Sequence, residues 1–478
     1  MSTRNAATPY AIDEHCLPTE LWAFSAVQLS EAFRLDQISP VEASRVILDR
    51  LSALDPVLNA FCFVDTDSVM RQARRSEERW RSGRSLSAID GVPVSVKDNL
   101  RAEGTPTLFG SLAVDRATSF HSDSPAVARL REAGAIILGK TTMPDFAYKV
   151  TTESPLTGVT VNPWNFERSP GGSSGGAAAA VAAGFGPLAL GTDGGGSIRV
   201  PASWSGIYGF KPSFGRVPHY PRGAFAPLSH VGPMTRTVMD AALMMQEISR
   251  PDSRDWYSLP LETIDFRSDV LSGVAGMTIA VSFNLGLRDL AVEPEITKAI
   301  SEAAELLRGL GATIVDTDPP AVATCQAIHR TMWASYCALV VRKFGEKRAS
   351  FDPGLLELAD FGESIPKHAF LEATAARADV GREINAFFSR YDLLLCPVSP
   401  IFAPETPPNS SPIVPGLTSW CNQTGLPAAS MPTGLSAQGL PIGVQIVGRR
   451  FADVDVLRAS YAVEHLRGPL AWPPLPTA

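Results

Sequence analysis

The sequence predicts an α/β fold in which a β-sheet is covered by helices on both faces. Short apolar runs alternate with segments of helical periodicity, which is the pattern of such sheets. The chain has 478 residues, of which 45% are hydrophobic and 19% are charged. This composition is that of a globular protein with a large core, and it excludes a disordered chain.

The first half of the chain contains two clear helix signals, each followed by extended segments. Ser39 and Pro40, with Glu42 three residues after the serine, form a capping box that opens a helix, and we expect Pro56 to end it. Val92, Val94 and Val96 alternate as a strand that ends at Lys97. A second helix is expected from Pro125 to near Gly134, with a buried strand over 135–138 directly after it.

The second half continues the alternation. Apolar runs predict strands at 188–190, 277–281, 312–315, 393–395 and 442–447, and a helical stripe covers 296–310. Neither an internal repeat nor a linker divides the sequence, so we expect one domain.

Composition narrows the class of function. The formal net charge is −7 and the chain has no long basic run, so a nucleic-acid partner is not expected. The six cysteines show no C-x-x-C spacing, which favours reduced thiols and a cytoplasmic protein. The uncharged segment 175–191 consists largely of Gly and Ala and contains Pro187, so we interpret it as a packed interior segment rather than a membrane span.

The segment 169–202 carries two glycine-flanked serines, Ser173 and Ser197. Consecutive glycines before a serine allow backbone N–H groups to point at one spot, as an oxyanion hole requires. The alternative interpretation is a pair of flexible loops. A nucleophile elbow needs a strand directly before Gly171, and the preceding residues are polar and end in proline. A phosphate-binding loop needs a Gly-Lys-Ser/Thr ending, which neither cluster has.

A serine nucleophile needs a base. The seven histidines lie in no motif, and we interpret each as a surface or packing residue: His15, His121, His219, His230, His329, His368 and His465. Lys97 is the better candidate because it ends an apolar strand, and a lysine removed from water has a lowered pKa.

These segments resemble the amidase signature family. The resemblance rests on Gly171–Gly176, on Asp193–Pro201 and on the spacing of 76 residues from Lys97 to Ser173 and 24 from Ser173 to Ser197. It extends over 85–240 and 390–455 and is weak over 250–390. It implies a large mixed sheet in one domain over 1–478, with an N-terminal helical arm at 1–84, a core at 85–250 and 390–470, and a variable substrate-shaping region at 251–389.

The resemblance also implies residue roles. Ser197 would be the nucleophile, Ser173, after a cis peptide bond, the proton relay, and neutral Lys97 the base. The N–H groups of Gly194, Gly195, Gly196 and Ser197 would form the oxyanion hole, with Ser174, Asp193 and Arg199 in support. Ala147 and Tyr148 would line the acyl pocket. No metal or organic cofactor is implied. We also expect aromatic residues of the variable region to shape the pocket, together with the later Trp420: Trp333, Tyr336 and Phe370.

Three functions are compatible with these features. We expect a stand-alone amidase that hydrolyses the C–N bond of a small-molecule amide, which includes an aryl amide, an anilide or a carbamate, or that hydrolyses an ester by the same chemistry. Neither nucleic acid nor a membrane is expected as a partner. A homodimer is the default expectation for the assembly. The alternative is the glutaminase (A-type) subunit of a tRNA-dependent amidotransferase. The third possibility is a non-catalytic binding protein on the same fold.

Overall fold

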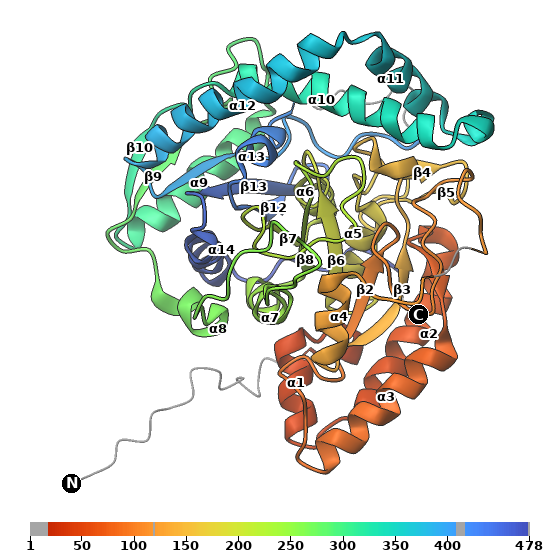
Figure 1. Cartoon of the computed structure of the whole chain (residues 1–478). Helices are drawn as coiled ribbons and strands as arrows, with labels where there is room; N and C mark the ends of the chain where they lie inside the picture. Colours follow the sequence, from red (N-terminus) through yellow and green to blue (C-terminus); the bar gives the residue numbers. More distant parts are fainter. Residues whose placement is uncertain (1–17, 118–119, 408–415, 477–478) are drawn as a thin grey trace.

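A computed structural model describes residues 18–117, 120–407 and 416–476 (Figure 1). His15 and Cys16 lie outside the described residues. The chain forms an eleven-stranded sheet in the order β1-β3-β2-β6-β8-β7-β12-β13-β11-β9-β10, and helices cover both faces of this sheet. The expected α/β class, with a large mixed sheet, is confirmed.

The strands of the large sheet include all those expected from the sequence. They are β1 (Phe61–Val64), β2 (Pro93–Lys97), β3 (Ile136–Thr141), β6 (Leu188–Asp193), β7 (Tyr208–Lys211), β8 (His230–Thr235), β9 (Thr278–Val281), β10 (Thr313–Asp316), β11 (Leu393–Pro397), β12 (Ala428–Leu435) and β13 (Pro441–Gly448). A separate two-stranded sheet pairs β4 (Glu153–Ser154) with β5 (Gly158–Val159).

The α-helices alternate with these strands along most of the chain. They are α1 (Ala26–Arg34), α2 (Pro40–Leu58), α3 (Thr66–Arg81), α4 (Pro125–Glu132), α5 (Gly175–Ala182), α6 (Arg199–Ser205), α7 (Val238–Ile248), α8 (Phe266–Asp269), α9 (Pro294–Gly309), α10 (Val322–Lys343), α11 (Pro353–Ser364), α12 (Lys367–Phe388), α13 (Ser419–Thr424) and α14 (Asp453–Arg467).

Helix α2 begins as expected and ends later than expected. The Ser39 side chain accepts from the Glu42 N–H and the Glu42 carboxylate accepts from the Ser39 N–H, which is a complete capping box. The helix passes Pro56 and ends at Leu58, so the prediction that Pro56 stops it is wrong. A proline in the last turn removes one backbone hydrogen bond, but Asn59 beyond it still donates to Asp55 O at 2.7 Å.

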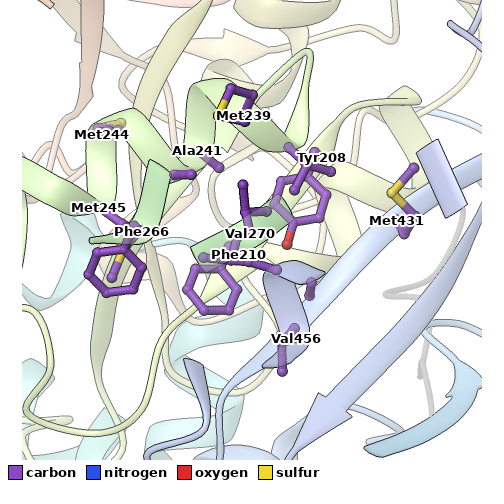
Figure 2. Close-up of a cluster of buried hydrophobic side chains, with 14 of the residues drawn as sticks. Tyr208, Phe210, Met239, Ala241, Met244, Met245, Phe266, Val270, Met431 and Val456 are labelled. Atoms are coloured by element: carbon purple, nitrogen blue, oxygen red, sulfur yellow. The ribbon is translucent and has the colours of Figure 1, made fainter. Parts of the chain in front are cut away.

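Strand β6 shows how side chains pack on the two faces of the sheet. Leu188 and Leu190 belong to the cluster shared with α7, whereas Ala189 between them packs with α5 and α6 on the other face. Figure 2 shows part of the first cluster, where the β7 rings of Tyr208 and Phe210 lie beside α7 and α14. Because these strands are buried on both faces, their sequences are continuous apolar runs.

The Gly- and Ala-rich segment forms α5 and the start of β6, and every residue of α5 is buried. Glycine and alanine allow the helix to approach its neighbours closely: a Cβ added at Gly176 would lie 2.5 Å from Ala60 O. None of the helices in the described ranges is both long enough and apolar enough to cross a membrane. The described cysteines are all free thiols.

The N-terminal region is not entirely helical. Besides α1, α2 and α3 it contains β1, which pairs antiparallel with β3 at one edge of the sheet. The strand that matters for the site is β2, which is parallel to β6, with Val94 opposite Leu188 and Val96 opposite Leu190. Parallel neighbours end at the same edge of a sheet. Lys97, the last residue of β2, therefore lies beside the end of β6, where the glycine-rich loop begins.

Candidate active site

The side chain of Lys97 lies between two serines at this edge of the sheet. Its Nζ is 2.8 Å from Ser173 Oγ, 2.8 Å from Ser174 Oγ and 3.4 Å from Thr192 O. Ser173 and Ser174 directly precede α5, and all three side chains are fully buried. The structure thus brings together residues that are 76 and 77 positions apart in the sequence.

Burial lowers the pKa of Lys97 well below its ordinary value, and the negative charge of Asp193 opposes this shift only in part. A neutral lysine amine has two N–H donors and one lone pair. Ser174 Oγ and Thr192 O are acceptors for the two donors, since the Ser174 hydroxyl can donate to Thr192 O at 3.1 Å. The third partner, the Ser173 hydroxyl, can then donate to the lone pair of Nζ, and in this arrangement a neutral lysine is able to take a proton from that serine.

Ser197 lies next to this cluster and retains 7% exposure, unlike the two buried serines. The backbone joins the two segments, because the Ser174 N–H donates to Ser197 O at 3.1 Å. The peptide bond between Gly172 and Ser173 is cis, as expected. Within the described residues, no hydrogen bond joins the Ser173 and Ser197 hydroxyls, so the structure contains the Lys97–Ser173 contact of the predicted relay without its second contact.

A buried ion pair shapes the loop that presents Ser197. Asp193 and Arg199 meet through two contacts, Nη2 to Oδ1 at 2.9 Å and Nε to Oδ2 at 3.0 Å, and both are fully buried. Burial alone would raise the pKa of Asp193, but the charge and hydrogen bonds of Arg199 reverse the shift and hold this pKa below its ordinary value. The Asp193 carboxylate also accepts the N–H groups of Gly196 at 2.8 Å and Ile198 at 3.2 Å, so it fixes both ends of the turn around Ser197.

These contacts correct the expected oxyanion hole. The Gly196 N–H already donates to Asp193, so it is not available to a substrate. Within the described part of the chain, the N–H groups of Gly194, Gly195 and Ser197 have no hydrogen-bond partner. Three unpaired donors adjacent to a serine hydroxyl are what a developing oxyanion requires.

Sequence reasoning missed three side chains that hold this loop in place. Thr418 Oγ1 donates to Gly195 O at 2.5 Å, and Asn422 Nδ2 donates to Asp193 Oδ1 at 2.9 Å. Gln445 Oε1 accepts from Arg199 Nη1 at 2.8 Å. Thr418 directly precedes α13, Asn422 lies in α13 and Gln445 lies in β13. All three follow the loop by more than 200 residues, so no local sequence pattern connects them to it.

The expected pocket residues fall in different places. Trp333 of α10 lies over the loop, since a Cβ added at Gly194 would be 3.0 Å from Trp333 Cζ3. Its indole N–H donates to Tyr148 O at 3.0 Å, which places Tyr148 and the preceding Ala147 beside the same ring. Trp420 is fully buried in the core and donates to Leu417 O, so it lines no opening. Tyr336 packs its ring against Phe225 and Phe370.

One of the histidines interpreted as surface or packing residues also contacts the loop. A Cβ added at Gly195 would lie 3.0 Å from both Cε1 and Nε2 of His329. The ring stacks on Trp333 at a centroid distance of 5.1 Å. His329 is one helical turn before Trp333, and this i, i+4 spacing was the only available sequence signal. Among the described residues, no group of three or more His, Cys, Asp or Glu side chains is arranged as a metal site.

Comparison with known proteins gives one family over most of the chain. A family described as Amidase matches residues 42–457. A curated relative from Moorella thermoacetica, the A-type subunit of glutamyl-tRNA(Gln) amidotransferase, is 36% identical over 93% of this chain and 97% of its own length. The protein of the same name from Myxococcus xanthus is also 36% identical, with the same coverage of both chains.

Solved structures agree with this assignment. A bacterial aryl acylamidase of the amidase signature family has a TM-score of 0.85 and 34% identity, over 92% of this chain and 96% of that one. The A-type subunit of glutamyl-tRNA(Gln) amidotransferase from Thermotoga maritima has a TM-score of 0.80 and 31% identity, over 96% of this chain and 99% of that one.

These relatives contradict two expectations from the sequence. Eight curated relatives that align with almost the whole chain at 32–36% identity carry the name of this amidotransferase component. The prediction of a stand-alone amidase, and the prediction of a small-molecule substrate without a nucleic-acid partner, are therefore wrong by this comparison. The physical reason for the error is that the motifs encode acyl transfer on a serine, which both kinds of enzyme use.

Proposed function

The chain belongs to the amidase family, and on that premise we propose that it is the amide-cleaving A-type subunit of a tRNA-dependent amidotransferase. In this role it releases ammonia from the side-chain amide of glutamine through an acyl-enzyme on Ser197. The observation that carries the chemistry is the fully buried contact of 2.8 Å between Lys97 Nζ and Ser173 Oγ, beside the loop of Ser197. The subunit role is supported by the full-length similarity to the curated relatives.

The first half-reaction acylates the enzyme. Ser197 Oγ attacks the amide carbon while its proton passes to Ser173 and the Ser173 proton passes to Lys97. This step needs the two hydroxyls to come into hydrogen-bond contact when substrate binds, as catalytic contacts often tighten in the complex. The oxyanion is held by the N–H groups of Gly194, Gly195 and Ser197.

The acylation is complete when the proton on Lys97 returns through Ser173 to the leaving nitrogen, the C–N bond breaks and ammonia departs. In the second half-reaction water attacks the ester carbon while one of its protons passes through Ser173 to Lys97. That proton then returns through Ser173 to Ser197 Oγ as the ester bond breaks, and the carboxylic acid product gives its own proton to ammonia or to the solvent. Because Lys97 is neutral before and after the cycle, no net proton remains on the site, which agrees with the direction in which burial moves its pKa.

The substrate contacts in this proposal come from the loop 146–148 and from α10. Ala147 and Tyr148 lie where the family resemblance places the acyl pocket, and the Tyr148 carbonyl is tied to Trp333. The Tyr148 hydroxyl donates to Asp352 Oδ1 at 2.7 Å, which keeps the ring in one orientation.

The test compares the chain alone with the chain co-expressed with the other subunits of the Moorella thermoacetica amidotransferase. The assay follows conversion of glutamyl-tRNA(Gln) to glutaminyl-tRNA(Gln) with glutamine as the nitrogen source. We expect conversion with the wild-type chain and none with Ser197→Ala, and we expect ammonium chloride to restore conversion in the Ser197→Ala complex. Rapid hydrolysis of other amides by the isolated chain, with no turnover of glutamine in either preparation, would refute the subunit role.

A further inference from the structure

Part of the loop that presents Ser197 is exposed to solvent. Asp193, Gly196 and Arg199 are buried, whereas Gly194 and Gly195 keep partial exposure. The side chains that stand over these two glycines are Trp333 and His329, which are themselves only half-buried. The two rings therefore border the exposed part of the loop directly before Ser197.

The two rings form one rigid surface, which we name the α10 wall and define as His329 and Trp333. They are stacked with an interplanar angle of 25°. The indole packs on Phe225 at a centroid distance of 4.2 Å. On the other ring, Nδ1 of His329 is 3.3 Å from Gln423 Nε2, and Gln423 belongs to α13, which also holds the loop. Because the indole and the imidazole are each held by a further contact, moving either ring aside would cost free energy.

The wall also has no formal charge at neutral pH. Burial lowers the pKa of His329 to about 4, and the nearby negative charge of Asp193 opposes this shift only in part. A neutral imidazole on an indole presents flat, apolar surface with one polar edge. Such a surface suits an uncharged acyl segment, and because the rings stand so close to Gly194 and Gly195 we expect them to obstruct a bulky acyl group.

We propose that the α10 wall determines which acyl groups reach Ser197, admitting those that are slim and uncharged next to the carbonyl and excluding bulky ones. The inference rests on the acylation of Ser197 in the proposed function and adds its substrate class: carboxamides with a slim, uncharged acyl segment next to the carbonyl, such as the two methylene groups of the glutamine side chain. The wall acts by contact with the acyl group and takes part in no proton transfer.

The experiment measures acylation of the full chain by two p-nitrophenyl esters, the acetate and the benzoate, from the pre-steady-state release of p-nitrophenol. Intact-mass spectrometry checks that one acyl group is added, with Ser197→Ala as the blank. The wild-type chain is expected to react faster with the acetate. Trp333→Ala should raise the benzoate-to-acetate rate ratio at least about tenfold, and His329→Ala should raise it by a smaller factor.

The controls separate this idea from a general loss of packing. Thr324→Ala, on the exposed side of the same helix, should leave the ratio unchanged. Trp333→Phe keeps most of the packing and should move the ratio in the same direction if Trp333→Ala does not fold. An unchanged benzoate-to-acetate ratio in every folded Trp333 variant would contradict the proposal that the α10 wall selects acyl groups.

The same assay distinguishes this failure from failure of the proposed function. If neither ester acylates the wild-type chain, the assignment of Ser197 as the nucleophile is contradicted, and the proposal about the α10 wall is contradicted with it. If the benzoate-to-acetate ratio shifts in the Trp333 variants but the chain never uses glutamine, the proposal about the α10 wall is supported and only the subunit role is contradicted.

Discussion

Lys97 Nζ lies 2.8 Å from Ser173 Oγ, and both side chains are fully buried. A charged lysine in this place would lose its hydration, and no carboxylate among the described residues is in direct contact to replace it, so burial favours the neutral amine. In the proposed function this relationship sets the reactivity of the site, and it also affects the stability of the fold.

Lys97→Met should keep the volume of the side chain and abolish its function as a base. We expect acylation by p-nitrophenyl acetate to fall about 10³-fold or more, because members of a catalytic triad act as a unit. The wild-type rate should fall as pH is lowered through the depressed pKa of Lys97, since protonation removes the base. The variant should lack this acid limb. Lys298→Met, which removes an exposed amine, is the matched control. A wild-type rate in Lys97→Met would contradict the assignment.

The same substitution should stabilise the fold at neutral pH. The pKa of Lys97 is lower in the folded chain than its ordinary value of 10.5, so between these two values the unfolded chain binds one more proton than the folded chain. This difference favours unfolding at neutral pH, and it disappears above pH 10.5. Urea unfolding should show Lys97→Met more stable than wild type at about pH 7, with the gain shrinking as the pH approaches the ordinary lysine value. A loss of stability at neutral pH would mean that the buried amine is charged and well paired.

Asp193→Asn should damage both stability and activity. It removes one partner of a buried ion pair and leaves the Arg199 charge uncompensated, which costs about 3–5 kcal/mol of unfolding free energy. The exposed pair of Arg348 and Asp360 provides a control, because Asp360→Asn should change stability by only about 0.5 kcal/mol or less. Equal effects of the two substitutions in urea unfolding would contradict the structural role of Asp193.

Gly196→Ala should disrupt the turn that presents Ser197. Gly196 has φ +138°, and an added Cβ would lie 2.2 Å from Thr418 Oγ1. We expect acylation to fall about 100-fold or more, which is the scale seen when an oxyanion contact is lost. Adding Thr418→Ala should recover only part of the rate, because the backbone strain remains. Gly345→Ala meets no atom within 4 Å and should behave as wild type. Wild-type rates in Gly196→Ala would show that the turn tolerates a side chain.

Much of the fold was accessible from the sequence because each element carried a local signal. The strand ending at Lys97 was visible from its alternating valines, and α2 from its Ser39 capping box. The motif spacing also connected Ser173 and Ser197 to Lys97 through a family resemblance. Such signals depend on residues close together in the chain or on a long, specific motif.

The remaining features depend on contacts that only the folded chain brings together. His329 reaches Gly195 from 134 positions away, and Thr418 reaches it from 223 away. The hydrogen bond that removes Gly196 from the oxyanion hole depends on the orientation of the Asp193 side chain, which no spacing encodes. Trp420 is a core residue despite its place near the motifs, since an aromatic ring is equally suited to a core or a pocket.

The most direct test of the proposed function is ammonia release from glutamine by the full chain assembled with its partner subunits, measured beside Ser197→Ala and Lys97→Met. We predict turnover by the wild-type chain and none above background in either variant. Turnover that survives in either variant would contradict the acyl-enzyme mechanism. Absence of glutamine turnover in a chain that rapidly hydrolyses other amides would contradict the subunit role.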